Sequence, residues 1–176
     1  LVSNQSKPLL RFISVGRLTM NQKPLDIMAT ALKELPFPWQ HWTIVGSGPD
    51  ESALRNKIKE LGLDKRTVFA GTLSSSEIAA LLDEHDIVLL PSNYESFFLT
   101  AYEAAAKGKI VVTNDVADVK KYFSDSSSVI IAKSVSKEAY RQAIIQAVEN
   151  QSDLVLSAVT VAQCVKTDFS WAGVAD

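Results

Sequence analysis

The sequence predicts an α/β fold, a Rossmann-like parallel sheet of six strands with helices on both faces. Short strand-like segments alternate with amphipathic helical segments along the whole chain. The strand segments are apolar throughout, as strands are when helices cover both faces of a parallel sheet. Glycine and polar residues follow the strands directly, where such sheets bind their ligands. We therefore expect residues 1–176 to form a single domain.

The predicted strands are β-rich apolar runs, and most of them end at a glycine or a proline. Gly16, Gly46 and Gly71 follow the first three runs, and Pro91 follows the fourth. In order, the predicted strands are residues 10–15, 41–45, 67–70, 86–90, 110–113 and 129–132.

The predicted helices follow from apolar residues at helical spacing and from signals at the helix ends. Asp50 is placed to cap the second helix, and Gly62 is a natural stop for it. Ser74 and Glu77 have the spacing of a capping box at the start of the third. In order, the predicted helices are residues 23–35, 51–61, 74–83, 97–107, 136–150 and 154–166.

Composition limits the classes of function. Apolar residues are 47% of the chain, and 18 basic against 20 acidic side chains give a net charge of −2. This balance argues against a nucleic-acid partner, because such proteins usually carry a strongly basic face. The single cysteine, Cys164, cannot form an internal disulfide and fits a reducing, cytoplasmic compartment. His41 and His85 lack the spacing of zinc ligands, so no metal and no cofactor are expected.

Four charged residues follow strands and are the candidate site. Arg17 follows the first strand and Lys23 stands at the start of the next helix, where two cations and a helix N-terminus suit a diphosphate. Glu95 lies in the loop after the fourth strand, and Glu103 lies on the helix that follows. A carboxylate near a sugar and another near ribose hydroxyls would suit a sugar nucleotide. Taken without context, each pair is more typical of solvated surface residues than of a binding site.

The backbone supplies two further features. The amides of Phe97, Phe98 and Leu99 would open a helix and could receive a phosphate. The sequence Gly46-Ser47-Gly48 resembles half of a dinucleotide fingerprint, but Glu51 stands where its third glycine belongs. We therefore expect a turn in which the backbone runs close to a ligand or to a neighbouring loop.

These segments together resemble the C-terminal, nucleotide-sugar-binding domain of a GT-B glycosyltransferase of the retaining group called family 4. The resemblance covers about residues 10–150 and rests on motifs in a fixed order. They are residues 15–18 (VGRL) with Lys23, residues 44–49 (IVGSGP), residues 68–71 (VFAG), and residues 91–92 (PS) leading to Glu95 and Glu103. The last pair has the spacing of the E-x7-E signature of that family.

The resemblance implies roles for these residues. Arg17 and Lys23 would hold the diphosphate and stabilise the charge on the leaving nucleoside diphosphate, without a metal ion. Glu95 would contact the donor sugar, and Glu103 would accept hydrogen bonds from the ribose. Residues 71–74 would lie beside the base. The substrate-binding residues implied in this way are Gly16, Gly71, Thr72, Leu73, Phe98, Leu99 and Glu103.

The resemblance also implies partners. The nucleotide sugar would be the donor, and a separate N-terminal domain, absent from this chain, would hold a carbohydrate or lipid-linked acceptor. Surface polysaccharide biosynthesis is the expected setting, in the cytoplasm or peripherally at the inner face of the membrane.

Several departures from the family pattern keep other functions open. Phe98 stands where Gly or Pro is common, and residues 115–122 lack the usual Gly and Glu. A catalytically degenerate module that binds a sugar nucleotide or a protein partner is therefore one alternative. An enzyme like the sugar-nucleotide epimerases and an NAD-binding Rossmann domain are the others.

Overall fold

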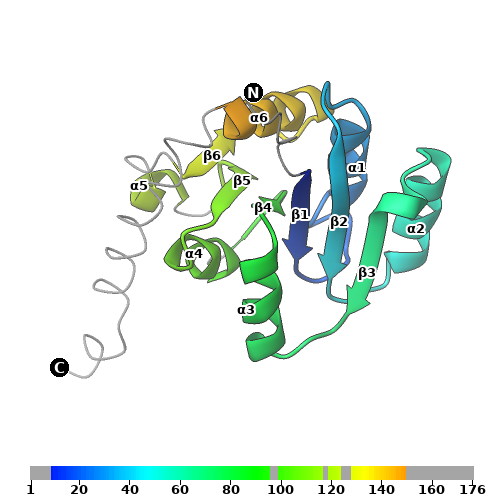
Figure 1. Ribbon diagram of the computed structural model, residues 1–176, viewed down its shortest axis with the longest axis horizontal. Helices are drawn as coiled ribbons and strands as arrows, with labels where there is room; N and C mark the ends of the chain where they lie inside the picture. Colours follow the sequence, from blue (N-terminus) through cyan, green and yellow to red (C-terminus); the bar gives the residue numbers. More distant parts are fainter. Residues whose placement is uncertain (1–8, 96–98, 117–118, 124–127, 150–176) are drawn as a thin grey trace, which may run out of the picture.

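The computed structural model describes residues 9–95, 99–116, 119–123 and 128–149, and Figure 1 shows their arrangement. The strands are β1 (Leu10–Val15), β2 (Trp39–Val45), β3 (Thr67–Gly71), β4 (Ile87–Leu90), β5 (Ile110–Asn114) and β6 (Val129–Ala132). The helices are α1 (Leu25–Lys33), α2 (Glu51–Glu60), α3 (Ser75–Glu84), α4 (Leu99–Ala106), α5 (Val119–Phe123) and α6 (Lys137–Glu149), with one 3-10 turn, η1 (Asp64–Arg66).

The strands form one parallel six-stranded sheet in the order β3-β2-β1-β4-β5-β6, which confirms the predicted fold class. The chain builds outward from β1 to β3 and then returns to the centre with β4. The order of the strands therefore reverses between β1 and β4, which pair through Phe12↔Ile87 and Ile13↔Val88. In open α/β sheets this reversal opens a crevice at the carboxyl ends of the strands, where ligands bind.

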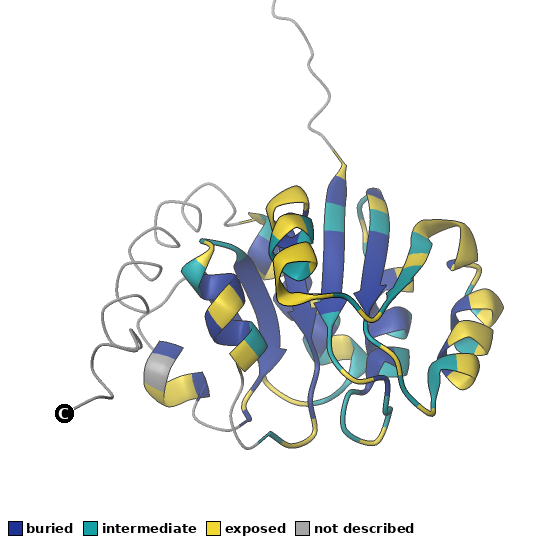
Figure 2. Cartoon of the chain, turned by 90° about the horizontal axis from the view of Figure 1, so that it is seen from below, coloured by how far each residue is buried: buried dark blue, intermediate teal, exposed yellow. Residues whose placement is uncertain are grey.

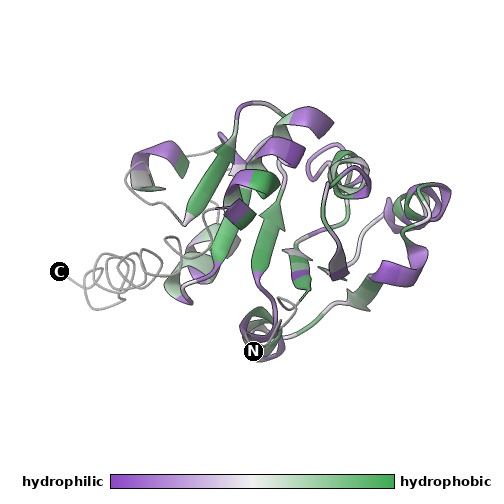
Figure 3. Cartoon of the chain, turned by 45° about the horizontal axis from the view of Figure 1, so that its top comes forward, coloured by the Kyte–Doolittle hydropathy of each residue, from purple (hydrophilic) through white to green (hydrophobic). Residues whose placement is uncertain are grey.

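Each face of the sheet carries its own hydrophobic core. Because successive side chains of a strand point to opposite faces, Phe12 packs with α1, α2 and α6, whereas Ile13 packs with α3, α4 and α5. Figure 2 shows the strands buried between helices whose outer faces are exposed, and Figure 3 shows the same division in hydropathy. This two-sided burial explains why the strands are apolar at consecutive positions.

The predicted elements are confirmed, with differences at their ends. Trp39 and Trp42 are buried in the core, so β2 begins earlier than its apolar run indicated. Helix α1 begins only at Leu25, after Pro24. Helix α5 and the turn η1 had no counterpart in the prediction, and the helix expected at residues 154–166 lies outside the described residues.

One predicted helix cap is confirmed and one is wrong. Ser74 and Glu77 form the reciprocal capping box at the start of α3. Asp50 precedes α2 but makes no side-chain cap. Its Oδ2 instead accepts a hydrogen bond from the backbone N–H of Met20 at 2.7 Å. The carboxylate therefore ties the loop before α2 to the loop after β1.

Within the part of the chain that the structure describes, no helix has both the length and the apolar character needed to cross a bilayer. The same residues contain no group of three or more His, Cys, Asp or Glu side chains that could hold a metal ion.

Candidate functional site

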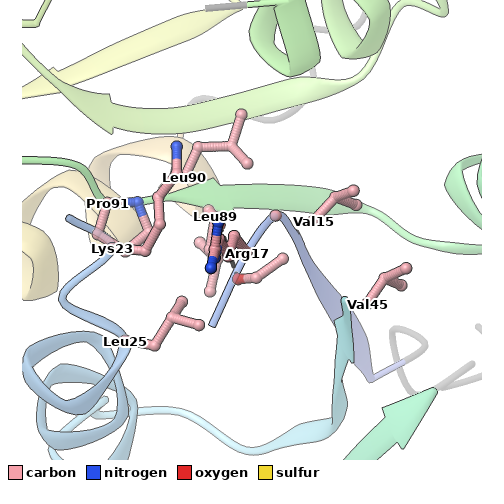
Figure 4. A pocket seen from close by; sticks show the side chains of 10 residues that line it. Val15, Arg17, Lys23, Leu25, Val45, Leu89, Leu90 and Pro91 are labelled. Carbon is pink, nitrogen blue, oxygen red and sulfur yellow. Dashed lines mark hydrogen bonds between the residues drawn. The ribbon is translucent and has the colours of Figure 1, made fainter. Parts of the chain in front are cut away.

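A pocket lies at the carboxyl ends of β1, β2 and β4, where the strand order reverses. Arg17 and Lys23 line it from the segment after β1, and Leu90 and Pro91 line it from the end of β4 and the residue that follows. Figure 4 shows these side chains around the pocket. The structure thus brings the two predicted cations to one hollow at the predicted edge of the sheet.

The loop that carries Arg17 and Lys23 is fixed by backbone hydrogen bonds to the loop after β2. The N–H of Gly16 donates to the carbonyl of Val45 at 3.0 Å, and the N–H of Leu18 donates to the carbonyl of Ser47 at 3.0 Å. Leu18 is also buried in the core. Buried backbone groups that are satisfied in this way hold a loop in one conformation. Both cations therefore start from a backbone of defined position.

Gly46 and Gly48 permit this contact between the two loops. A Cβ built on Gly46 would lie 1.9 Å from the carbonyl oxygen of Gly16, and one on Gly48 would lie 2.2 Å from that of Leu18. Any side chain at either position would separate the loops. The expectation of a close approach to a neighbouring loop is confirmed, and it accounts for these glycines without a dinucleotide.

Lys23 and Glu95 form an ion pair across the crevice, joining Nζ to Oε1. Their side chains are 13% and 12% exposed. The hydroxyl of Ser92 donates to the same Oε1 at 3.0 Å. Partly buried charges interact more strongly than exposed ones because less water screens them. Two predicted site residues, 72 positions apart in the chain, are thus in direct contact.

A second, more open hollow of about 280 Å³ lies beside the first, between the loops after β1, β2 and β3. Gly16 and Arg17 line both hollows. Thr72 and Leu73, predicted to lie beside a nucleotide base, line the second. Arg17 is exposed, and its guanidinium makes no hydrogen bond or ion pair with any residue that the structure describes. It is therefore placed between the two hollows with its donors available.

Other predicted site residues lie apart from these two hollows. Gly71 ends β3, where its carbonyl accepts a hydrogen bond from the N–H of Gly46 at 2.7 Å. Glu103 is exposed on α4, and Leu99 is 60% exposed at the start of that helix. Neither Glu103 nor Leu99 is among the residues that line the two hollows. Phe98 lies outside the described residues. The roles of these residues stay predictions.

The structure adds two residues that the sequence did not indicate. Asn114, at the end of β5, and Tyr140, on α6, are buried and hydrogen-bonded to each other at 2.6 Å. Burial raises the pKa of the Tyr140 hydroxyl, which therefore stays protonated. Asn114 could have been found from the sequence, because it lies at the carboxyl end of a predicted strand. Tyr140 had no such signal, because an aromatic residue at a core position of a helix is ordinary.

His85 is buried before β4, and both of its ring nitrogens are used inside the fold. Because a carbonyl can only accept, Nδ1 donates to the carbonyl of Leu81 at 2.6 Å, and Nε2 accepts from the Thr43 hydroxyl at 2.8 Å. Burial lowers the pKa of His85. The residue is therefore a neutral structural histidine.

Fold and site together define a doubly wound α/β domain with Arg17 and Lys23 at its strand-order reversal. Residues 3–158 match the sequence family described as Glycosyl transferases group 1, and the chain belongs to that family. The predicted glycosyltransferase family is thus confirmed, whereas its assignment to family 4 stays a prediction.

Named relatives agree with this assignment. Over 163 residues the chain is 29% identical to the glycogen synthase of Mycobacterium tuberculosis H37Rv, a match that covers 92% of this chain and 39% of the relative. Over 169 residues it is 27% identical to the amylovoran biosynthesis glycosyltransferase AmsK of Erwinia amylovora, covering 92% of this chain and 41% of the relative. The chain thus spans about two fifths of the length of these relatives.

Solved structures share the fold. The Anabaena protein HepE in complex with UDP and glucose superposes with a TM-score of 0.84 at 20% identity, covering 94% of this chain and 46% of that one. Sucrose-phosphate synthase from Thermosynechococcus elongatus superposes with a TM-score of 0.83 at 21% identity, covering 94% and 43%.

Proposed function

We propose that this chain is the donor-binding domain of a glycosyltransferase that moves a sugar from a nucleoside diphosphate sugar to a carbohydrate or lipid-linked acceptor. The observation that carries the proposal is the position of Arg17, Lys23 and Glu95 at the strand-order reversal. Membership of the glycosyltransferase family and the UDP complexes of HepE support it.

In this proposal the two cations hold the diphosphate. Negative charge grows on the leaving diphosphate as the glycosidic bond breaks, and fixed positive groups stabilise that charge. An ammonium group has three donors, so Lys23 can keep its bond to Glu95 while it contacts a phosphate oxygen. No metal ion is required, because Arg17 and Lys23 supply the positive charge. Glu95 is then held beside the sugar by the residue that holds its phosphate.

The remaining groups complete the donor site. Thr72 and Leu73 would flank the base in the second hollow, next to Gly16 and Arg17. Glu103 would accept from the ribose. The acceptor would be held by a further domain, since the relatives are more than twice as long as this chain. The proposed setting is surface polysaccharide biosynthesis, and the name of AmsK, which places that relative in amylovoran biosynthesis, supports it. The enzyme would act in the cytoplasm or at the inner membrane face.

Nucleotide titration tests the proposal. Calorimetry with UDP, GDP and ADP should detect binding of at least one nucleotide. The double substitution Arg17→Ala and Lys23→Ala should weaken that binding by about 100-fold, because hydrogen bonds to charged groups contribute about 1.5–3 kcal/mol each.

The matched control removes two exposed lysines far from the pocket, Lys33 at the end of α1 and Lys65 in η1. Lys33→Ala with Lys65→Ala deletes the same net charge and should leave the affinity within about twofold, because exposed charges at a distance are screened. Absence of binding to all three nucleotides by the folded wild-type chain would refute the proposal.

A further inference from the structure

A chain of buried hydrogen bonds connects helix α6 to the carboxylate of Glu95. Its members are Tyr140 on α6, Asn114 at the end of β5, and Ser92 in the loop after β4. Asn114 and Tyr140 line neither of the two hollows. Their contacts with the loop after β4 are made through Ser92, whose hydroxyl donates to Glu95.

Asn114 holds the backbone of Ser92 on both sides. Its Oδ1 accepts from the N–H of Ser92 at 3.0 Å, and its Nδ2 donates to the carbonyl of Ser92 at 2.7 Å. The ladder between β4 and β5 ends at the pair Leu90↔Thr113. The carboxamide thus continues the pairing where the strand has already turned into a loop. This fixes the start of the loop that leads to Glu95.

Tyr140 fixes the carboxamide in turn. Its hydroxyl donates to Oδ1 of Asn114 at 2.6 Å, and its side chain is 0% exposed. With Tyr140 and Ser92 both donating to this oxygen, the amide has one favourable orientation, in which Nδ2 faces the Ser92 carbonyl. A buried network of this kind is costly to leave partly satisfied, so each member constrains the next.

The loop after β4, fixed in this way, holds Glu95 and its partner Lys23. The Ser92 hydroxyl donates to Oε1 of Glu95, which also receives Lys23. Asn93 binds the loop of Lys23 directly, because its N–H donates to the carbonyl of Gln22 at 2.8 Å. Its Nδ2 also donates to the carbonyl of Asn21 at 2.7 Å. The position of Glu95 thus depends on residues of β5 and α6.

We propose that Asn114 and Tyr140 are positioning residues that aim Glu95 at the donor sugar. This inference rests on the proposed function for the identity of the ligand. A positioning role predicts unequal losses of affinity for the sugar and for the diphosphate, whereas a general loss of stability would weaken both equally. Glu95 depends on the network, whereas the backbone beside Arg17 is fixed by the end of β2 and the loop after it. The N–H of Lys23 donates to the carbonyl of Thr19 at 2.7 Å within its own loop. Disturbing the network should therefore weaken recognition of the sugar more than recognition of the diphosphate.

The test compares Tyr140→Phe with Ile144→Val, a buried position on the same helix outside the network. Affinities are measured for UDP and UDP-glucose, ADP and ADP-glucose, and GDP and GDP-mannose. In Tyr140→Phe, affinity for the bound nucleotide sugar should fall about tenfold, and that for its nucleoside diphosphate by no more than about twofold. Ile144→Val should change neither. Equal losses for both ligands, or no loss, would overturn the inference.

A second measurement needs no ligand. Hydrogen exchange at the amides of Ser92 and Asn93 should become faster in Tyr140→Phe and faster still in Asn114→Asp, whose carboxylate cannot donate to the Ser92 carbonyl. It should be unchanged in Ile144→Val. Unchanged exchange in both network variants would overturn the positioning role. If the wild-type chain binds no nucleotide, the proposed function fails, while this measurement still decides whether the network holds the loop.

Discussion

Gly46 and Gly48 have no side chain, and this allows the backbone of the loop after β1 to pack directly against them. The atoms that a side chain would meet are backbone atoms of Gly16 and Leu18, which cannot rotate away as a flexible side chain can. Gly46 also has φ +127°, a conformation that other residues rarely adopt. The geometry of the cation-bearing loop therefore depends on the absence of two Cβ atoms.

Substitution of Gly48 tests this dependence. Gly48→Ala should lower the free energy of unfolding by about 3 kcal/mol, because its Cβ must displace the backbone of Leu18. Gly62 is a control with φ +69°, where an added Cβ would meet only the flexible Lys33 Nζ at 3.9 Å, so Gly62→Ala should cost about 1 kcal/mol for backbone strain. Urea denaturation of both variants measures the difference. Equal costs would show that the loops can separate freely.

At the same scale, the sequence predicted part of the site. Arg17, Lys23 and Glu95 each follow a strand, so the rule that ligands bind beyond strand carboxyl ends was enough to select them. Their pairing was not predicted, because loop lengths do not fix which side chains meet. Tyr140 was beyond prediction, since its hydroxyl has a role only once α6 packs over the end of β5.

Among the elements, the capping box of α3 shows a local signal that tertiary contacts did not override. The Ser74 side chain accepts from the N–H of Glu77 at 3.4 Å, and the Glu77 carboxylate accepts from the N–H of Ser74 at 2.8 Å. The hydrogen bonds from Ser74 lower the pKa of Glu77. Both partners lie within one turn, so sequence spacing alone predicted them.

Removal of this cap should destabilise the fold by a measurable amount. Ser74→Ala should lower the free energy of unfolding by about 1 kcal/mol, the usual cost of losing a serine N-cap. Ser75→Ala, one residue inside the helix, should change it by less than about 0.5 kcal/mol. Thermal and urea unfolding of the two variants compare them. A larger loss in Ser75→Ala would contradict the assignment of the cap.

Other features of the elements could not be predicted from local sequence patterns. Asp50 has the sequence signature of a helix cap, but its carboxylate is taken by the N–H of Met20 from another loop. Helix α5 spans only five residues, too few to produce a helical period in the sequence. Local patterns therefore predicted the order and type of most elements but not α5, and they did not reveal the hydrogen bond between distant loops that takes up Asp50.

For the whole molecule, the buried neutral His85 links stability to pH. Burial lowers its pKa, and His41 and Arg11 act in the same direction, whereas the hydrogen bond to the Leu81 carbonyl and the charge of Glu84 oppose them. The unfolded chain therefore takes up a proton near pH 6.5, the ordinary value, before the folded chain does. Proton uptake by the unfolded state favours unfolding, so stability should be full above this pH and fall below it.

The melting temperature of the wild-type chain should accordingly decrease between pH 7.5 and pH 5.5. His85→Asn should show a flatter dependence over this range, whatever its melting temperature at pH 7.5, because it lacks the titrating ring. His41→Asn removes only one of the smaller causes of the shift and should flatten the dependence less than His85→Asn does. A wild-type slope that persists in His85→Asn would assign the pH dependence to another group.

The strand order has a consequence for solubility. Within the described residues, β3 and β6 are the outermost strands of the sheet, and they contain only five and four residues. The unpaired backbone groups of edge strands can pair with strands of other molecules and start aggregation. Short edge strands expose few such groups. The hydrophobic strands β1, β4 and β5 lie inside, where no second molecule can pair with them.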